Sequence, residues 1–248
     1  ISDTDTRYRQ RYVDLWVSPE ARNVFKIRSK MMSLTRSFLE TRGAIEVETP
    51  MFHPIPRGAN ARPFTTHHNA LDLDLYLRVA PELYLKRLTV AGFEKVFEIG
   101  RVFRNEGVST RHNPEFTMLE LYEAYADYED IMQLVEELVE YLAVELTGST
   151  ILKIDGQELD VARPWRRATM VELIEEAIGT TLSLDTPLDE LRAVAADHEV
   201  PIKESYGPGK LILEIYEKTT ESALWGPVYV TDYPIEVSPL SREHRSEA

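Results

Sequence analysis

The chain has 248 residues, of which 42 are Asp or Glu and 28 are Lys or Arg, so its formal net charge is −14. A hydrophobic fraction of 43% is typical of a globular protein, and the length allows one large domain or two smaller ones. No apolar stretch is long enough for a membrane helix. The charge also argues against a protein that binds nucleic acid over its whole surface, because phosphate neutralisation requires clustered Lys and Arg.

The sequence contains no cysteine, which excludes disulfide bonds, thiolate zinc sites and a cysteine nucleophile. The first residues lack the basic, apolar and small-residue zones of a signal peptide. We therefore expect a cytoplasmic protein that does not associate with membranes.

The N-terminal part of the chain predicts one helix, one short strand and a long loop. Residues 20–42 place apolar side chains close to a 3.6-residue repeat and are followed by Gly43, which indicates an amphipathic helix. Residues 44–47 predict a short strand that stops before Pro50. The next segment, 54–63, is rich in Pro and turn residues, and loops of this length are often functional.

The middle of the chain predicts a hairpin and a long helix. Residues 94–104 and 114–125 have the pattern of two antiparallel strands joined by a polar loop at 105–113. Asp127 is expected to cap a helix with one continuous apolar face, and Gly148 is expected to end that helix.

The sequence pattern changes after Trp165, in the C-terminal part of the chain. Short helical pieces are predicted at 169–178 and 187–197, and a strand at 228–232. The pattern indicates an α+β fold. The expected organisation is a first domain at 1–167, a mostly helical insertion at 168–225 and a return to the first domain's sheet at 226–248.

Two common nucleotide-binding signatures are missing from the sequence. The segment Gly207–Lys210 does not have the P-loop spacing, and no G-x-G-x-x-G motif follows a strand. His67 and His68 lack companion ligands at the spacing of a metal site, so we interpret them as loop histidines.

The predicted hairpin carries the most informative side chains. Because side chains alternate along a strand, Phe116, Glu120 and Tyr122 should project from one face. If that face were only core, Glu120 would be a buried charge without a partner, which is costly. A face that lines a binding site would give this carboxylate a function.

The charged loop of the hairpin has two interpretations. Arg104 and Arg111 could be solvated charges that Glu106 and Glu115 neutralise. Alternatively, arginine and histidine side chains could bind phosphate oxygens while Phe116 lies under a base, which would make an ATP site without a glycine-rich loop. The aromatic neighbour favours the second interpretation.

The segments Phe103–Gly107 and His112–Thr117 resemble motif 2 of the class II aminoacyl-tRNA synthetases, and are most similar to the lysine-specific members. The helix at 24–42 together with Glu46–Pro50 resembles motif 1, whose proline lies at a dimer interface in that class. Further segments similar to the lysine-specific family are 7–12, 58–64, 66–70, 78–87 and 233–240.

The resemblance implies an antiparallel sheet flanked by helices, with a bent ATP molecule on the sheet and a homodimeric assembly. The implied reaction is attack of the L-lysine carboxylate on the α-phosphate, which gives lysyl-adenylate and pyrophosphate, followed by transfer of lysine to tRNA(Lys). Such a reaction requires charge neutralisation and alignment more than a proton shuttle.

The resemblance also implies a role for individual residues. Arg104 would be the catalytic residue that bridges the α-phosphate and the substrate carboxylate. Phe116 would stack on the adenine base. The implied ATP-binding residues are Arg104, Glu106, His112, Asn113 and Phe116, and the implied lysine-binding residues are Gly58, Glu82, Arg104, Glu120 and Tyr122.

The chain departs from the family pattern at one position and is shorter than the family. Arg57 stands where a second glycine usually precedes Gly58, and its side chain could point to solvent or obstruct a lysine pocket. The ligands of the Mg²⁺ ion and the motif 3 arginine would lie beyond Ala248, and the anticodon-binding barrel before Ile1. We therefore expect a fragment without metal ligands that is inactive alone.

Three hypotheses follow from the sequence. The first is part of a lysyl-tRNA synthetase, the second a paralogue that lysylates a protein acceptor, and the third a non-catalytic synthetase-like module. The segments 7–14 and 58–64 favour the first.

Overall fold

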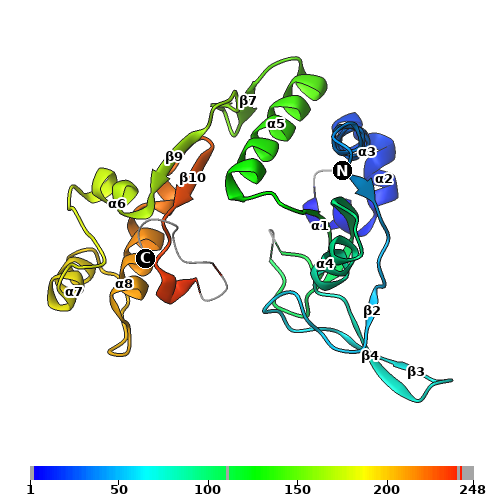
Figure 1. Ribbon diagram of the computed structural model, residues 1–248. Coiled ribbons are helices and arrows are strands. Elements are labelled where there is room, and N and C mark those ends of the chain that lie inside the picture. Colours follow the sequence, from blue (N-terminus) through cyan, green and yellow to red (C-terminus); the bar gives the residue numbers. More distant parts are fainter. Residues whose placement is uncertain (1–2, 110–111, 239–240, 242–248) are drawn as a thin grey trace. The chain divides into compact units, whose positions relative to one another are not determined.

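The computed structural model describes residues 3–109, 112–238 and 241. Its contacts divide the chain into two units, Ile1–Ile131 and Met132–Ala248 (Figure 1). The structure combines helices with mixed and antiparallel sheets, so the predicted α+β class is confirmed.

Three helices lie at the start of the first unit. The predicted helix at 20–42 is confirmed as α3, which begins with Pro19 in its first turn and is followed by Gly43 at a φ of +79°. Two short helices before it were not predicted. Both are held by the buried carboxylate of Asp14, which accepts hydrogen bonds from Arg7 (2.8 Å) and Arg11 (2.7 Å). The bounds are α1 Thr4–Arg9, α2 Arg11–Val17 and α3 Pro19–Thr41.

The central sheet of the first unit has the strand order β1-β5-β6. The predicted hairpin is confirmed, because β5 (Lys95–Phe103) pairs antiparallel with β6 (Glu115–Glu123). The predicted short strand is β1 (Ile45–Glu46), and it pairs parallel with β5. The sheet is therefore mixed at its β1 edge.

A second, antiparallel sheet of the first unit has the order β2-β4-β3. Figure 1 shows β3 and β4 as a hairpin that projects away from the helices of this unit. The helix α4 (Glu82–Val90) follows β4 after a short buried turn at 79–81. The strand bounds are β2 Phe52–His53, β3 Thr65–His68 and β4 Leu73–Leu77.

The long helix α5 (Tyr128–Thr147) agrees with the prediction at both ends. Asp127 Oδ1 accepts a hydrogen bond from the backbone N–H of Glu129 (2.9 Å), and Gly148 follows the last residue with a φ of +81°. A hairpin of β7 (Ile151–Ile154) and β8 (Gln157–Asp160), which was not predicted, comes next in the chain.

The core of the second unit forms where helices pack on two parallel strands. The predicted strand at 228–232 is β10, and it pairs with β9. The predicted helical pieces are confirmed as α6 and α7, whereas α8 was not predicted. The completely buried Met170, Ile174 and Leu211 belong to this core. The bounds are β9 Arg166–Thr169, α6 Met170–Ile178, α7 Leu188–Asp197, α8 Pro208–Thr219 and β10 Val228–Thr231, with 3₁₀ turns at Glu221–Ala223 and Ile235–Val237.

The division between the two units falls after Ile131, not at the expected boundaries. The expected boundary between 167 and 168 lies inside β9. The assignment of 1–167, 168–225 and 226–248 as functional domains therefore remains a proposal.

Candidate active site

The face of β6 that carries Glu120 and Tyr122 forms the floor of the candidate site. The phenol of Tyr122 donates a hydrogen bond to Glu120 Oε2 over 3.3 Å, so the two side chains lie together as predicted. Strand alternation places Phe116 on the same face. Opposite these residues in the ladder, β5 presents Glu98 beside Glu120 and Val102 beside Phe116.

The electrostatics of this floor favour a cationic ligand. Burial raises the pKa of Glu120, nearby Glu82 and Glu98 raise it further, and the hydrogen bond from Tyr122 opposes the rise. Burial, followed by the charges of Glu120 and Glu82, raises the pKa of Tyr122, so the phenol keeps its proton and remains a donor. An ammonium group that enters this half-buried region would relieve the repulsion among the carboxylates.

The structure brings Gly58 and Glu82 together at one edge of this region. A Cβ atom on Gly58 would lie 3.1 Å from Ala80 Cβ and 3.5 Å from Glu82 Oε2, and Gly58 has a φ of +99°. Both the contact and the backbone conformation therefore favour glycine. Glu82 begins α4 and forms an ion pair with Lys86, whose Nζ lies 5.9 Å from the ring centroid of Tyr122.

Arg104 and Phe116 also lie together. The guanidinium carbon of Arg104 is 5.3 Å from the ring centroid of Phe116. The backbone N–H of Arg104 donates to the carbonyl of Pro114 over 2.9 Å. Arg104 Nε is buried and has no hydrogen-bond partner among the described residues. A buried donor without an acceptor is costly, so an oxyanion would satisfy this group.

The loop between β5 and β6 places the remaining predicted residues near the surface. His112 is exposed, and its Nδ1 lies 2.8 Å from Ser109 Oγ. Glu106 and Asn113 are exposed as well. Their contacts with ATP stay predictions, and Arg111 lies outside the described residues.

The interpretation of the loop arginines as neutralised charges receives no support from Glu115. Its Oε1 lies 3.6 Å from Arg101 Nε, so this carboxylate is paired with a residue of β5.

Sequence reasoning missed a buried ion pair beside the floor. Arg78, which is 1% exposed, donates from Nη1 to Glu98 Oε1 over 2.5 Å and to Thr49 Oγ1 over 3.1 Å. A signal was present, because Glu98 interrupts the apolar strand Lys95–Phe103 on the same face as Glu120.

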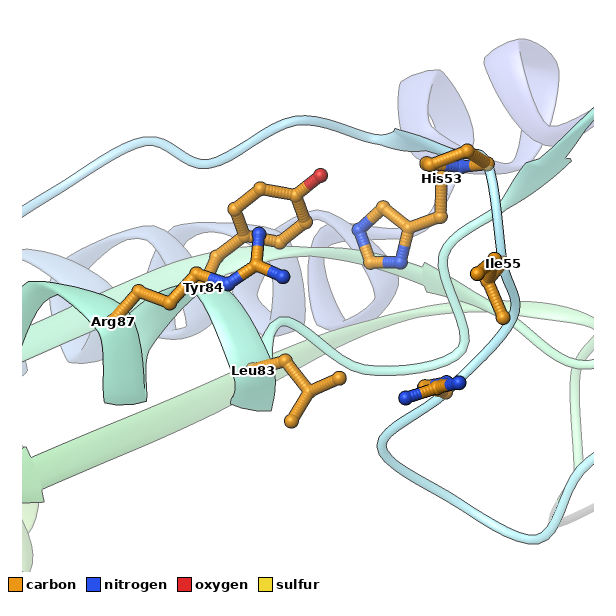
Figure 2. A pocket seen from close by; sticks show the side chains of 7 residues that line it. His53, Ile55, Leu83, Tyr84 and Arg87 are labelled. Carbon is orange, nitrogen blue, oxygen red and sulfur yellow. The ribbon is translucent and has the colours of Figure 1, made fainter.

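Arg57 lines a separate pocket close to α4. Figure 2 shows the ring of Tyr84 near His53, with Arg87 beside it; the two rings are 5.0 Å apart, and Arg87 lies 5.2 Å from the Tyr84 centroid. Burial is the main cause that lowers the pKa of His53. The side chain of Arg57, the residue at which the chain departs from the family pattern, is exposed. The neighbouring carboxylate of Glu82 forms its ion pair with Lys86. The pocket is lined by His53, Pro54, Ile55, Arg57, Leu83, Tyr84 and Arg87.

The described part of the chain holds no group of three or more His, Cys, Asp or Glu side chains suited to a metal ion. His67 contacts Asp74 (2.8 Å) and Asp72 (3.4 Å) in the exposed β3–β4 hairpin. Among the same residues, no helix combines the length and apolar character needed to span a bilayer.

Comparisons with known proteins agree with this geometry. Residues 3–248 match the family model of tRNA synthetases class II (D, K and N). The chain is 56% identical over all of its length to a "Lysine--tRNA ligase" of Xanthomonas oryzae pv. oryzae, and covers 49% of that relative. Proteins with the same name from Carboxydothermus hydrogenoformans and Bacillus subtilis are 52% and 50% identical over 99% and 98% of the chain, which covers 50% and 49% of them. The chain thus spans about half the length of these relatives, and it belongs to the class II tRNA synthetase family (D, K and N).

Proposed function

We propose that the whole protein is a cytoplasmic, homodimeric lysine–tRNA ligase. It activates L-lysine with ATP to lysyl-adenylate and pyrophosphate, and transfers the lysyl group to tRNA(Lys). The observation that carries this proposal is the meeting of Glu82 and Glu120 with the donor Tyr122 at one partly buried floor. Identities of 50–56% to proteins named as lysine–tRNA ligases support the same assignment.

The floor provides a separate partner for each ammonium group of lysine. Glu82, beside Gly58, is proposed to bind the α-amino group, where the substrate would replace Lys86 as the partner of the carboxylate. Glu120 is proposed to bind the ε-amino group, and the hydrogen bond from Tyr122 would hold the Glu120 carboxylate in place. Each desolvated cation then has an anionic partner, which offsets the cost of its burial.

Arg104 is proposed to align the reacting groups. Its buried, unpaired Nε would donate to an oxygen of the substrate carboxylate or of the α-phosphate. The carboxylate oxygen forms the new bond to phosphorus as the bond to the pyrophosphate oxygen breaks, so no proton has to move in this step. Fixed positive charge at the α-phosphate and close alignment supply the acceleration.

ATP is proposed to lie along the hairpin. Phe116 would stack on adenine, Glu106 and Asn113 would contact the base, and His112 would reach the phosphates. The family implies Mg²⁺ as well, but the described residues do not offer a site that fits it.

Charging of tRNA tests the second half of the proposal. The full-length protein, incubated with ATP and labelled lysine, should transfer the label to unfractionated tRNA, and prior cleavage of the tRNA 3′ end should abolish the transfer. A label that enters protein and not tRNA would replace the proposal with lysylation of a protein acceptor.

A further inference from the structure

Arg78 is a buried arginine at the junction of several segments that carry the proposed lysine-binding residues. It follows β4 and precedes α4, whose first residue is Glu82. Its side chain is 1% exposed in an acidic protein where most arginines reach the surface. Burial of a guanidinium requires compensation, so the contacts of this side chain show what its position achieves.

The contacts of Arg78 fix the end of β5, immediately before Arg104. The Arg78 carbonyl accepts a hydrogen bond from the N–H of Phe103 over 2.9 Å. Its Nε donates to the carbonyl of Arg101 over 2.7 Å. These two hydrogen bonds of Arg78 therefore hold the last residues of β5, the strand that leads directly into Arg104.

The same residue binds the segment that follows β1. The Arg78 N–H donates to Met51 O over 2.9 Å, and Nη1 donates to the carbonyl of Thr49 over 3.3 Å and to its hydroxyl over 3.1 Å. Thr49 in turn donates to Glu98 Oε2 over 2.6 Å. Both carboxylate oxygens of Glu98 are thereby occupied, one by Arg78 and one by Thr49.

The hydrogen bonds of Arg78 and Thr49 to Glu98 determine which carboxylates of the floor remain available to bind a substrate. Glu98 stands directly opposite Glu120 in the β5–β6 ladder and on the same face. Without Arg78, Glu98 beside Glu120 would lose its cationic partner and keep only the hydrogen bond from Thr49. Arg78 lowers the pKa of Glu120, whereas Glu98 and Glu82 raise it.

Gly100 accommodates the guanidinium. A Cβ at this position would lie 2.2 Å from Arg78 Nη2, so even alanine would displace the group. Nη2 is itself buried and has no hydrogen-bond partner among the described residues. An unmade hydrogen bond is a cost that the fold tolerates, which indicates that the location of the guanidinium matters more than full pairing.

We infer that Arg78 is a positioning residue for lysine activation. It holds the segments that contain Glu82, Arg104 and Glu120 in register, and its ion pair with Glu98 keeps that carboxylate away from the substrate. This inference rests on the proposed function. The adenine-side residues Phe116 and Asn113 do not share these bonds, so loss of Arg78 should affect lysine more than ATP.

The test compares variants of the full-length protein in lysine-dependent ATP–pyrophosphate exchange. Arg78→Met/Glu98→Gln removes the guanidinium without leaving a buried carboxylate charge. We expect kcat/KM for lysine to fall about 100-fold, as for a misplacement of reacting groups by about 1 Å, with KM for ATP changed less than about threefold. Arg87→Met, which removes an exposed arginine of α4, is the matched control and should retain wild-type constants.

A purely structural role predicts a different result. Arg78→Met alone should lower the melting temperature, and the added Glu98→Gln should recover part of it. If the double variant recovers lysine activation together with stability, Arg78 only neutralises Glu98 and the inference is overturned. Gly100→Ala keeps Arg78 but pushes on it, so wild-type lysine constants in folded Gly100→Ala would also overturn the inference, even if the other variants fail to fold.

Hydrogen exchange separates this inference from the proposed function. In the full-length protein, the double variant should lose amide protection at residues 101–104 and 49–51, while the core of the second unit keeps its protection. Unchanged protection at both segments would overturn the positioning role. Failure of the wild-type protein to activate lysine would instead overturn the proposed function.

Discussion

Arg104 combines partial burial, a neighbouring aromatic ring and an Nε without a partner among the described residues. We predict that Arg104→Ala in the full-length protein lowers kcat/KM in lysine-dependent pyrophosphate exchange, because the activation free energy rises by about 3–4 kcal/mol, the cost of losing one preorganised donor. Arg101→Ala is the control, because Arg101 lies in β5, just before Arg104, and pairs with Glu115. Equal effects of the two substitutions would exclude a specific role for Arg104.

Glu120 should give the chain a characteristic dependence of stability on pH. Burial raises its folded-state pKa above the ordinary value of 4.5, so the folded chain binds this proton more tightly than the unfolded chain. The free energy of unfolding should therefore fall as the pH rises from 4.5 through the higher folded-state pKa. Glu120→Gln should remove that fall and stabilise the chain at neutral pH.

Thermal unfolding of the 248-residue chain between pH 4 and 8 measures this effect. Glu123→Gln is the control, because Glu123 lies on the other face of β6 and forms a 2.6 Å ion pair with Lys95. The same pH slope in Glu120→Gln and the wild type would show that Glu120 is not destabilised in the fold.

Part of the site could be predicted from residue patterns. Strand alternation alone placed Phe116, Glu120 and Tyr122 on one face, because a two-residue period is local information. The Arg78–Glu98 pair spans 20 residues and depends on how β4 approaches β5, which no local pattern encodes. The closeness of Gly58 and Glu82 was expected only from the family resemblance.

At the level of elements, long periodic segments were predicted correctly. The helices α3 and α5 and the β5–β6 hairpin each repeat their pattern over many residues. The short helices α1 and α2 were missed because they are brief and depend on the ion pairs of Asp14 with Arg7 and Arg11, which no apolar periodicity reveals. Residues 207–210 were tested only against the P-loop spacing, so the start of α8 was missed, although Pro208 occupies a first-turn position that suits a helix.

The helix α3 should form part of a homodimer interface. Its N-terminal half exposes Val24, Phe25 and Ile27 at 64%, 50% and 44%, which is unfavourable in water unless another surface covers them. We predict that the full-length protein is a dimer at micromolar concentration and that Phe25→Asp weakens dimerisation at least about tenfold. Sedimentation velocity measures this.

The control for the dimer prediction is Val90→Asp, which changes a residue of α4 that is 90% exposed. It should leave the sedimentation coefficient unchanged. A wild-type monomer at micromolar concentration would contradict the interface, as would a Phe25→Asp protein that still sediments as a dimer.

For the molecule as a whole, the net charge of −14 matches the character of the candidate site. Around the floor, Glu82 and Glu98 raise the pKa of Glu120, while Arg78 pairs with Glu98 and Lys86 pairs with Glu82. Such a site favours a substrate with two positive groups. It should reject acidic amino acids by repulsion and neutral ones because its buried carboxylate would remain unpaired.

The most direct test of lysine activation is ATP–pyrophosphate exchange by the full-length protein with lysine, norleucine, aspartate and asparagine in parallel. Norleucine lacks the ε-ammonium group, and the other two are the remaining candidates in a family described by D, K and N. We predict that lysine supports exchange with a kcat/KM about 10⁴-fold above that of norleucine, the discrimination expected of a site built to pair a polar group. Exchange that depends on aspartate or asparagine, or that norleucine supports as well as lysine, would contradict the account.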